Sequence, residues 1–222
     1  MKESTSKAPK SRKPRGDGHE RIPEILAAAQ RVFSREGFAK TTMRRVASEA
    51  GVSPAGLYLY FSSKEAILVA IRDQTFADLH KYTRDAVIDV VDAEQRLRKH
   101  LTAYLRYATT NPDSYRLTMR SQLIRTPRAG RPASAREAIG REAFNDLLDD
   151  IADLIHPDES HDENITHELA ETTWAIIHGL SSLAIDVPDF PTSGIDNCLN
   201  QALNMIIAGI RSHEPGRSGI RT

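Results

Sequence analysis

Hydrophobic side chains recur every three or four residues along the chain from Arg21 onward, which is the spacing of one helix face. Leu26, Ala29 and Val32, for example, fall on a single face. No segment alternates apolar and polar residues convincingly enough to predict a strand. We therefore predict an all-α fold of about nine helices with no sheet. The predicted helices cover about residues 21–36, 42–50, 53–61, 62–90, 94–109, 112–124, 134–155, 164–186 and 193–211.

Short sequence signals mark where several of these helices begin and end. Gly51 follows the second predicted helix, in the position where a left-handed residue commonly closes a helix. Ser53-Pro54 opens the third helix with a capping side chain and a proline in the first turn. Ser62 and Glu65 have the spacing of a capping box, which predicts that the fourth helix starts there.

Composition narrows the class of protein. The chain has 222 residues, one Cys and one Trp, so a disulfide framework or a thiolate-rich metal cluster is excluded. Its longest apolar stretches fall far short of the roughly 18 residues that span a bilayer. The basic N-terminus has no hydrophobic segment behind it and does not resemble a secretory signal. We expect a cytoplasmic protein without a membrane partner.

The neutral total charge hides a difference between the two parts of the chain. Residues 1–64 hold 13 Lys and Arg against 6 Asp and Glu, whereas residues 65–222 hold 17 against 24. A net charge of +7 at one end is typical of a segment that binds a polyanion, although imbalances of this size also arise by chance. Charge alone therefore decides little.

The same patterns predict four parts of the chain. A basic, aperiodic segment at residues 1–20 is expected to be a disordered arm. A three-helix helix-turn-helix domain is expected at residues 21–66, followed by a larger helical domain at residues 67–212 and a disordered tail at 213–222.

The segment Thr41–Lys64 has the pattern of a helix-turn-helix. Ala47 is small where two helices would cross, and Gly51 supplies the positive φ of the turn. Val52 and Leu57 would fill the space between the helices. The second helix of such a motif can lie in the DNA major groove, although hairpins of this kind also occur in plain helical cores.

This segment resembles the N-terminal domain of TetR-type transcriptional regulators. The resemblance is dense from Ile22 to about Leu68 and includes Gly-Phe after the first helix, Thr-Thr-Met at the start of the second, an Ala-Gly-Val-Ser turn and a Leu-Tyr-x-Tyr-Phe-x-x-Lys close. More sparsely, Thr110–Leu117 and Trp174–Ala184 resemble the Trp-His-Gly subgroup of TetR-type C-terminal domains.

The resemblance implies a set of DNA contacts. At the start of the second helix, the Thr42 hydroxyl would contact a phosphate, and Arg44 would contact a guanine edge or a phosphate. The recognition helix would place small residues at the floor of the groove. That helix begins Pro54-Ala55-Gly56 and is poor in donors for base edges, so we expect Arg44, the arm and DNA shape to carry more of the sequence preference. The implied contact residues are Thr42, Arg44, Ser53, Ala55, Gly56, Tyr58, Tyr60 and Lys64.

Alternatives remain open for several of these positions. The Tyr58 ring could pack partly into the core, and Arg45 is interpreted as a solvated surface charge. The basic arm could contact phosphates or enter the minor groove, or it could only aid solubility. The whole motif could also belong to a helical ligand- or protein-binding module that no longer engages DNA.

The larger domain carries a candidate effector pocket and candidate dimer contacts. Trp174 and His178 are four residues apart and share a helix face, which fits either a pocket wall or a packed Trp beside a core His. Gly179 would let another helix approach at that level. The candidate pocket residues are Tyr104, Leu117, Trp174 and His178. The apolar stripes of the last two helices predict either core or a dimer interface at Ile177, Leu199, Leu203, Ile206 and Ile210.

Other chemistry has weaker support. The loop from His156 to His161 is interpreted as a polar linker rather than a metal site, and Cys198 as a core residue rather than a thiol switch. His80, His100 and His167 stand alone on charged faces. No phosphate loop, nucleophile elbow or catalytic group is evident, so we expect neither an enzyme nor a cofactor.

The expected function is that of a repressor. The resemblance implies a homodimer that binds a palindromic operator in double-stranded DNA, because a single three-helix unit covers too little of the groove. A small-molecule effector of unknown identity would release the protein from DNA.

Overall fold

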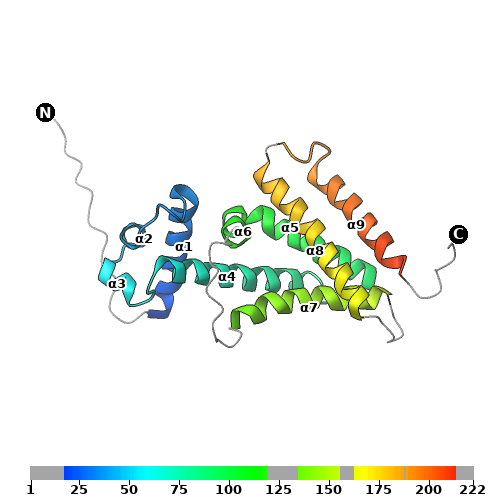
Figure 1. Cartoon of the computed structure of the whole chain (residues 1–222), viewed down its shortest axis with the longest axis horizontal. Helices are drawn as coiled ribbons and strands as arrows, with labels where there is room; N and C mark the ends of the chain where they lie inside the picture. The colour runs from blue at the N-terminus through cyan, green and yellow to red at the C-terminus, as the bar shows by residue number, and fades with distance from the viewer. Residues whose placement is uncertain (1–17, 120–134, 156–162, 188, 214–222) are drawn as a thin grey trace. The chain divides into compact units, whose positions relative to one another are not determined.

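The computed structural model of the chain describes residues 18–119, 135–155, 163–187 and 189–213. Within these residues all regular elements are helices, which confirms the all-α prediction (Figure 1). The described part contains no helix of the length and apolar character that a bilayer crossing requires. Most of the predicted arm and tail, the His156–His161 loop and residues 120–124 lie outside the described residues. The helices are α1 Gly18–Glu36, α2 Met43–Ala50, α3 Pro54–Tyr58, α4 Lys64–Asp85, α5 Ala93–Thr110, α6 Pro112–Met119, α7 Ala135–Ile155, α8 Glu163–Asp186 and α9 Ile195–Arg211.

Several helix ends differ from the sequence prediction. The α1 helix begins at Gly18, inside the predicted arm, and α9 begins at Ile195 rather than at residue 193. The α3 helix ends at Tyr58 rather than at residue 61. Ser63, not Ser62, caps α4, since its hydroxyl accepts from the backbone N–H of Ala66 at 3.2 Å. The α4 helix ends at Asp85 rather than near residue 90, because the chain continues in turns in which Val87 N–H bonds Arg84 C=O.

The chain divides into an N-terminal unit, Met1–Ile67, and a C-terminal unit, Leu68–Thr222. In the N-terminal unit α2 packs against α1 and α3. Its apolar core contains Ala29 and Val32 from the face of α1 that the periodicity marks, but it takes Ile25 in place of Leu26, which is half-buried. Residues from each following helix complete the core. The fully or almost fully buried side chains include Ile25, Ala29, Val32, Phe33, Val46, Ala47, Leu57 and Ile67.

The turn between α2 and α3 forms as the sequence indicates. Gly51 adopts φ 66° and ψ 29°, a left-handed conformation that costs strain for a residue with a β-carbon. Ala47 is completely buried where the helices approach. Ser53 accepts a hydrogen bond from the Gly56 N–H at 3.0 Å and caps α3. The orientation of α3 is therefore fixed by local chemistry.

Lys64 ties the start of α4 to the loop before α2. Its ammonium donates to the carbonyl oxygens of Phe38, Ala39 and Thr41 at 3.0, 3.2 and 3.1 Å. It also lies 4.7 Å from the centre of the Phe38 ring. These carbonyls occupy its three N–H donors and therefore do not favour the predicted contact of Lys64 with a phosphate.

Replacing Lys64 by Met is expected to lower the free energy of unfolding by about 2 kcal/mol, because charge-assisted hydrogen bonds to three carbonyls are lost. Urea denaturation followed by circular dichroism measures this change. Lys40→Met is the matched control, since Lys40 is an exposed lysine of the same loop with no polar partner among the described residues. The control should change stability by less than about 0.5 kcal/mol. Equal losses from the two substitutions would contradict the structural role of Lys64.

In the C-terminal unit α5 packs against α6, α7, α8 and α9 (Figure 1). The side chains that meet around α5 form one continuous apolar core, to which α4 adds Leu79. The five candidate dimer residues belong to this core, which corrects their assignment to a free interface. Their exposed fractions are 1% for Ile177, 5% for Leu199, 3% for Leu203, 6% for Ile206 and 1% for Ile210.

Candidate nucleic-acid interface and ligand cavity

Most of the predicted DNA-contact residues lie on the surface of the N-terminal unit. Gly56 and Tyr60 are half-buried, and 56% of Tyr58 is exposed, so that ring is not a core side chain. An exposed phenol can offer its hydroxyl to a phosphate oxygen. The fully accessible members of the predicted set are Thr42, Arg44, Ser53, Ala55 and Tyr58.

Two hydroxyls on this surface are held by helix caps. The Thr42 oxygen accepts from the Arg45 N–H at 3.2 Å and caps α2, so its own O–H remains a donor for an external group. Ser53 caps α3 in the same way. A β-carbon at Gly56 would lie 3.0 Å from the Ser53 Oγ, so glycine at this position keeps the cap in place.

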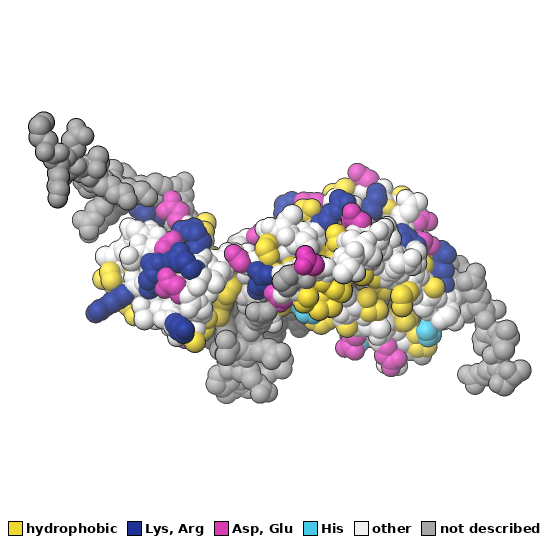
Figure 2. All heavy atoms as spheres, turned by 90° about the horizontal axis from the view of Figure 1, so that it is seen from above, with side chains coloured by type: hydrophobic (Ala, Val, Ile, Leu, Met, Phe, Trp, Pro, Cys, Tyr) yellow, Lys and Arg dark blue, Asp and Glu magenta, His cyan; other side chains and the backbone are white. Residues whose placement is uncertain are grey.

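A network of ion pairs neutralises much of the remaining basic surface of the unit. Arg45 pairs with Glu36 at 2.8 Å and with Glu49 at 3.2 Å, while Arg31 and Arg35 each reach Glu49 at 3.3 Å. Hydrogen bonds from these guanidinium groups lower the pKa of both Glu36 and Glu49. Figure 2 shows basic and acidic side chains interleaved on this unit. Arg45 is therefore a paired residue rather than the solvated charge that the sequence indicated.

Lys40 and Arg44 are the cations that this network leaves free. Arg21 pairs with Glu24 at 3.5 Å, and Lys64 is tied to carbonyls, so among the described residues of the unit only these two have no polar partner. Both are exposed, and Arg44 lies within two residues of the capping hydroxyl of Thr42. Sequence analysis missed Lys40, because charge counting does not separate paired from unpaired cations.

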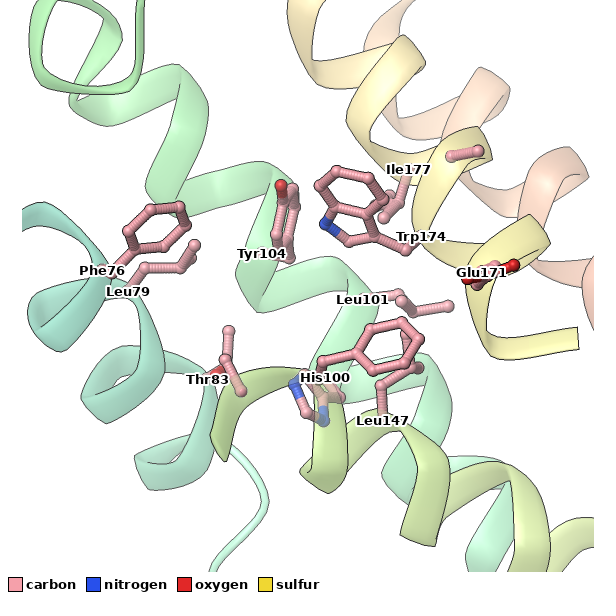
Figure 3. A pocket seen from close by; sticks show the side chains of 13 residues that line it. Phe76, Leu79, Thr83, His100, Leu101, Tyr104, Leu147, Glu171, Trp174 and Ile177 are labelled. Atoms are coloured by element: carbon pink, nitrogen blue, oxygen red, sulfur yellow. The ribbon is translucent and has the colours of Figure 1, made fainter. Parts of the chain in front are cut away.

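A cavity of about 470 Å³ lies within the C-terminal unit (Figure 3). Helices α4, α5, α7 and α8 supply its wall, which is mainly aliphatic and aromatic. In Figure 3, Tyr104, Trp174 and Ile177 lie toward one end, and Thr83, His100 and Leu147 toward the other. This volume and lining are typical of small-molecule sites. The wall is formed by Phe76, Leu79, Thr83, His100, Leu101, Tyr104, Ala143, Phe144, Leu147, Glu171, Trp174, Ala175 and Ile177.

The structure brings together only two of the four predicted pocket residues. Tyr104 and Trp174 line the main cavity, whereas His178 lines a separate cavity of about 110 Å³. Leu117 is half-buried and lines neither of them. Trp174 and His178 stack with ring centres 5.3 Å apart, so their spacing in the sequence did place them on one face.

Hydrogen bonds join the cavity wall to the smaller cavity. The Tyr104 hydroxyl lies 3.1 Å from the Tyr115 hydroxyl, which lies 2.6 Å from His178 Nδ1. Burial raises the pKa of Tyr104 well above its ordinary value and also raises that of Tyr115. Both phenols therefore remain protonated at neutral pH and serve as uncharged hydrogen-bond groups.

Burial lowers the pKa of His178. Between this lowered value and the ordinary value of about 6.5, the unfolded chain binds a proton at His178 that the folded chain does not. The free energy of unfolding should therefore decrease as the pH falls from about 6.5 to the lowered pKa of His178. Outside this pH range His178 should make no further difference to stability. His178→Gln, which retains a hydrogen-bonding group but cannot titrate, should flatten the fall. Melting temperatures of both proteins from pH 5 to 8 measure the difference, and parallel curves would contradict it.

His100 belongs to a buried polar network that the sequence did not indicate. Its Nδ1 lies 2.7 Å from Asp150 Oδ2, and the other oxygen of Asp150 accepts from Arg96 Nε at 2.7 Å. Only 5% of His100 and 4% of Asp150 are exposed. His80 likewise lies 2.8 Å from Asp146. These partners are 50 and 66 residues away in the chain, so no local pattern could reveal them.

Exposed apolar side chains gather on α8, α9 and the segment between them. They include Ile176 and Leu183 on α8, and Met205 on α9 with 73% of its surface exposed. Figure 2 shows hydrophobic side chains clustered on one face of the C-terminal unit. Gly179 and Gly209 lie on the same two helices, and a β-carbon at either would meet nothing within 4 Å. No described helix of the chain therefore makes the close approach that Gly179 was expected to allow.

Comparison with known proteins matches both units. Residues 25–71 match the sequence model of bacterial regulatory proteins of the tetR family. Residues 97–205 match the tetracycline repressor-like C-terminal domain. The chain belongs to the TetR family. As a TetR-family protein it is a DNA-binding transcription regulator and not an enzyme.

Solved structures share the fold of this TetR-family chain. A regulatory protein of the tetR family from Rhodococcus RHA1 has 21% identity and a TM-score of 0.67, over 86% of this chain and 97% of that one. The fatty acid degradation regulator FadR from Bacillus halodurans has 14% identity and a TM-score of 0.68, over 90% and 99%. A TetR family regulator from Marinobacter aquaeolei VT8 has 23% identity and a TM-score of 0.64, over 86% and 95%.

Proposed function

We propose that this TetR-family chain is a repressor that binds a palindromic operator as a homodimer and is released by a small-molecule effector. The observation that carries the proposal is the coincidence, in one chain, of an unpaired basic surface on a helix-turn-helix and an apolar cavity of about 470 Å³. A protein that only bound DNA would have no use for a cavity of that kind.

The DNA contacts are assigned to the exposed surface around the starts of α2 and α3. Thr42 and Tyr58 donate hydroxyls, Lys40 and Arg44 supply free cations, and Ser53, Ala55 and Gly56 allow close approach of the backbone. Tyr60, which is half-buried, contributes at the edge of this surface. Lys64 is left out of the set because its ammonium is already bound to three carbonyls.

The homodimer is assigned to the outward faces of α8 and α9. Ile176 and Leu183 project from α8, and Met205 projects from α9. Gly179 and Gly209 lie within these helices, where glycine costs about 1 kcal/mol relative to alanine without any packing need inside the chain. The close approach of a second copy supplies that need. This set takes the place of the five candidate dimer residues, which lie in the core.

The α4 helix is assigned the coupling role. It contributes Ile67 to the core of the N-terminal unit and lines the cavity of the C-terminal unit with Phe76, Leu79 and Thr83. A ligand that shifts these side chains acts on a helix that also anchors the DNA-binding unit. Such coupling is reciprocal, so DNA weakens effector binding by the same factor. The Trp-His-Gly assignment of the C-terminal domain stays a prediction that the stacked pair Trp174–His178 supports.

Fluorescence anisotropy tests the proposal. The protein is titrated into a labelled copy of the palindrome nearest its gene, with and without compounds that bind it in a thermal-shift screen. We expect tight binding alone and weaker binding with an effector. Undiminished binding with every compound shown to bind would contradict effector release. Absence of salt-dependent binding to any duplex would instead favour the module that no longer engages DNA.

A further inference from the structure

His100 lines the cavity and has one ring nitrogen, Nε2, for which the described residues supply no hydrogen-bond partner. Thr83 donates its hydroxyl to the His80 carbonyl at 3.0 Å. The Tyr104 hydroxyl lies 3.1 Å from the Tyr115 hydroxyl. Glu171, the acidic residue of the wall, is exposed to solvent. His100 Nε2 is therefore the nitrogen of a buried wall residue that is left for a ligand.

The orientation of His100 sets the hydrogen-bonding character of that atom. Nδ1 lies against Asp150, whose carboxylate is also bound by the permanently charged Arg96, so Asp150 acts as an acceptor and Nδ1 carries the proton. With the ring proton on Nδ1, a neutral imidazole has its lone pair on Nε2, the ring nitrogen that no described residue contacts. Only 5% of His100 is exposed, so this nitrogen belongs to a buried side chain.

Charge at the cavity argues against an anionic ligand. No Lys or Arg lines it among the described residues, and its one acidic residue, Glu171, is exposed and lies 3.4 Å from His167. A carboxylate buried here would meet no fixed cation and would have to replace its hydration with apolar contacts. An uncharged ligand with one donor group satisfies Nε2 without that cost.

We propose that the effector is an uncharged, largely apolar molecule with one hydroxyl, and that this hydroxyl donates a hydrogen bond to His100 Nε2. The inference rests on the proposed function and names the ligand class of the same site. The aromatic residues of the cavity wall, Phe76, Tyr104, Phe144 and Trp174, offer flat apolar surfaces to the aromatic rings of such a ligand.

Four compounds on one skeleton test this class. Calorimetry or a thermal-shift titration of the full-length protein, without DNA, compares 4-phenylphenol, 4-acetylbiphenyl, biphenyl and biphenyl-4-carboxylate. We expect 4-phenylphenol to bind about tenfold tighter than each of the others, the factor that follows from one satisfied buried acceptor. Tightest binding of the carboxylate, equal binding of all four, or no binding below about 1 mM would each overturn the proposal.

Two variants separate recognition by His100 from a structural role. His100→Phe retains a ring but removes the acceptor, so the preference for the phenol should vanish while biphenyl still binds. In Asp150→Asn, the amide oxygen accepts the hydrogen bond from Arg96, so the NH₂ group faces His100 and donates to Nδ1. The ring proton of His100 then moves to Nε2. The ketone should then bind at least as well as the phenol. An unchanged tenfold preference in Asp150→Asn would overturn the proposal.

The design keeps this inference separate from the repressor proposal. Ligand preference is measured on protein free of DNA, whereas release is measured by anisotropy on the operator. A chain that prefers the phenol but never leaves DNA would refute release alone. A chain that leaves DNA with a carboxylate or a cation would refute the ligand class alone.

Discussion

Substituting Arg44 by Ala is expected to weaken operator binding by about 100-fold and to relax base preference at the position it contacts. Arg44 is exposed and has no polar partner among the described residues, so its whole charge and all its donors are available to DNA. A dimer carries two copies of Arg44, so the substitution removes two contacts and the two losses of binding free energy add. The recognition helix has few side-chain donors of its own, so no neighbouring group replaces the lost one. Anisotropy at several salt concentrations measures both the affinity and the salt slope.

Arg31→Ala is the matched control for Arg44. It removes the same charge from the same unit, but Arg31 is paired with Glu49 at 3.3 Å in a network of three arginines and two glutamates. We expect a change in affinity of less than about threefold, because a paired surface cation contributes little to either stability or binding. If both variants lose affinity equally, net charge rather than the position of Arg44 determines binding.

Placing a charge on the outward face of α8 is expected to convert the dimer to monomers. Ile176→Asp would bury an unpaired carboxylate in the apolar contact between copies, and Met205→Glu would do the same on α9. Operator affinity should fall by two orders of magnitude or more, since each half-site is then bound without its mate. Light scattering coupled to size-exclusion chromatography measures the mass, and anisotropy measures the DNA affinity.

Ile88→Asp provides the control for both substitutions. Ile88 is 78% exposed in the same unit but lies in the turn after α4, away from α8 and α9 in the chain. It should leave the protein dimeric. A monomer from Ile88→Asp, or a dimer that survives Ile176→Asp and Met205→Glu together, would refute the assigned interface.

Gly179→Ala sharpens the same test because its two effects have opposite signs. In an isolated chain the alanine should stabilise α8 by about 1 kcal/mol, since its methyl group meets nothing within 4 Å. In the dimer the same methyl group would separate the helices and weaken association. A gain in both monomer stability and dimer affinity would show that Gly179 faces solvent rather than a second copy.

Local signals predicted much of the N-terminal unit. The capping residue Ser53, the left-handed Gly51 and the buried Ala47 all follow from chemistry within a few residues, and the structure has each of them as expected. The cap at Thr42 was not predicted. The same approach placed one cap a residue early, at Ser62, because two adjacent serines present the same signal and only the hydrogen bond to Ala66 distinguishes them.

The sequence could not show where a side chain finds its partner far along the chain. The family resemblance assigned Lys64 to DNA, yet carbonyls 23 to 26 residues away hold its ammonium. The apolar stripe of α9 was compatible with a core or a dimer, and the packing of α5, α7 and α8 against it decided for the core. The sequence showed no partner for His100, because Asp150, which lies beside it in the structure, is 50 residues away in the chain.

The sequence by itself determined that this chain is helical throughout its periodic part and that it carries a helix-turn-helix of the TetR type, because caps, turns and helix faces depend on neighbours within about four residues. Only the tertiary structure decided which cations are free, which apolar stripes are buried and which polar atoms enter the cavity. Those properties depend on contacts between helices, and the residues that make such contacts are separated by spacings that no periodic pattern encodes.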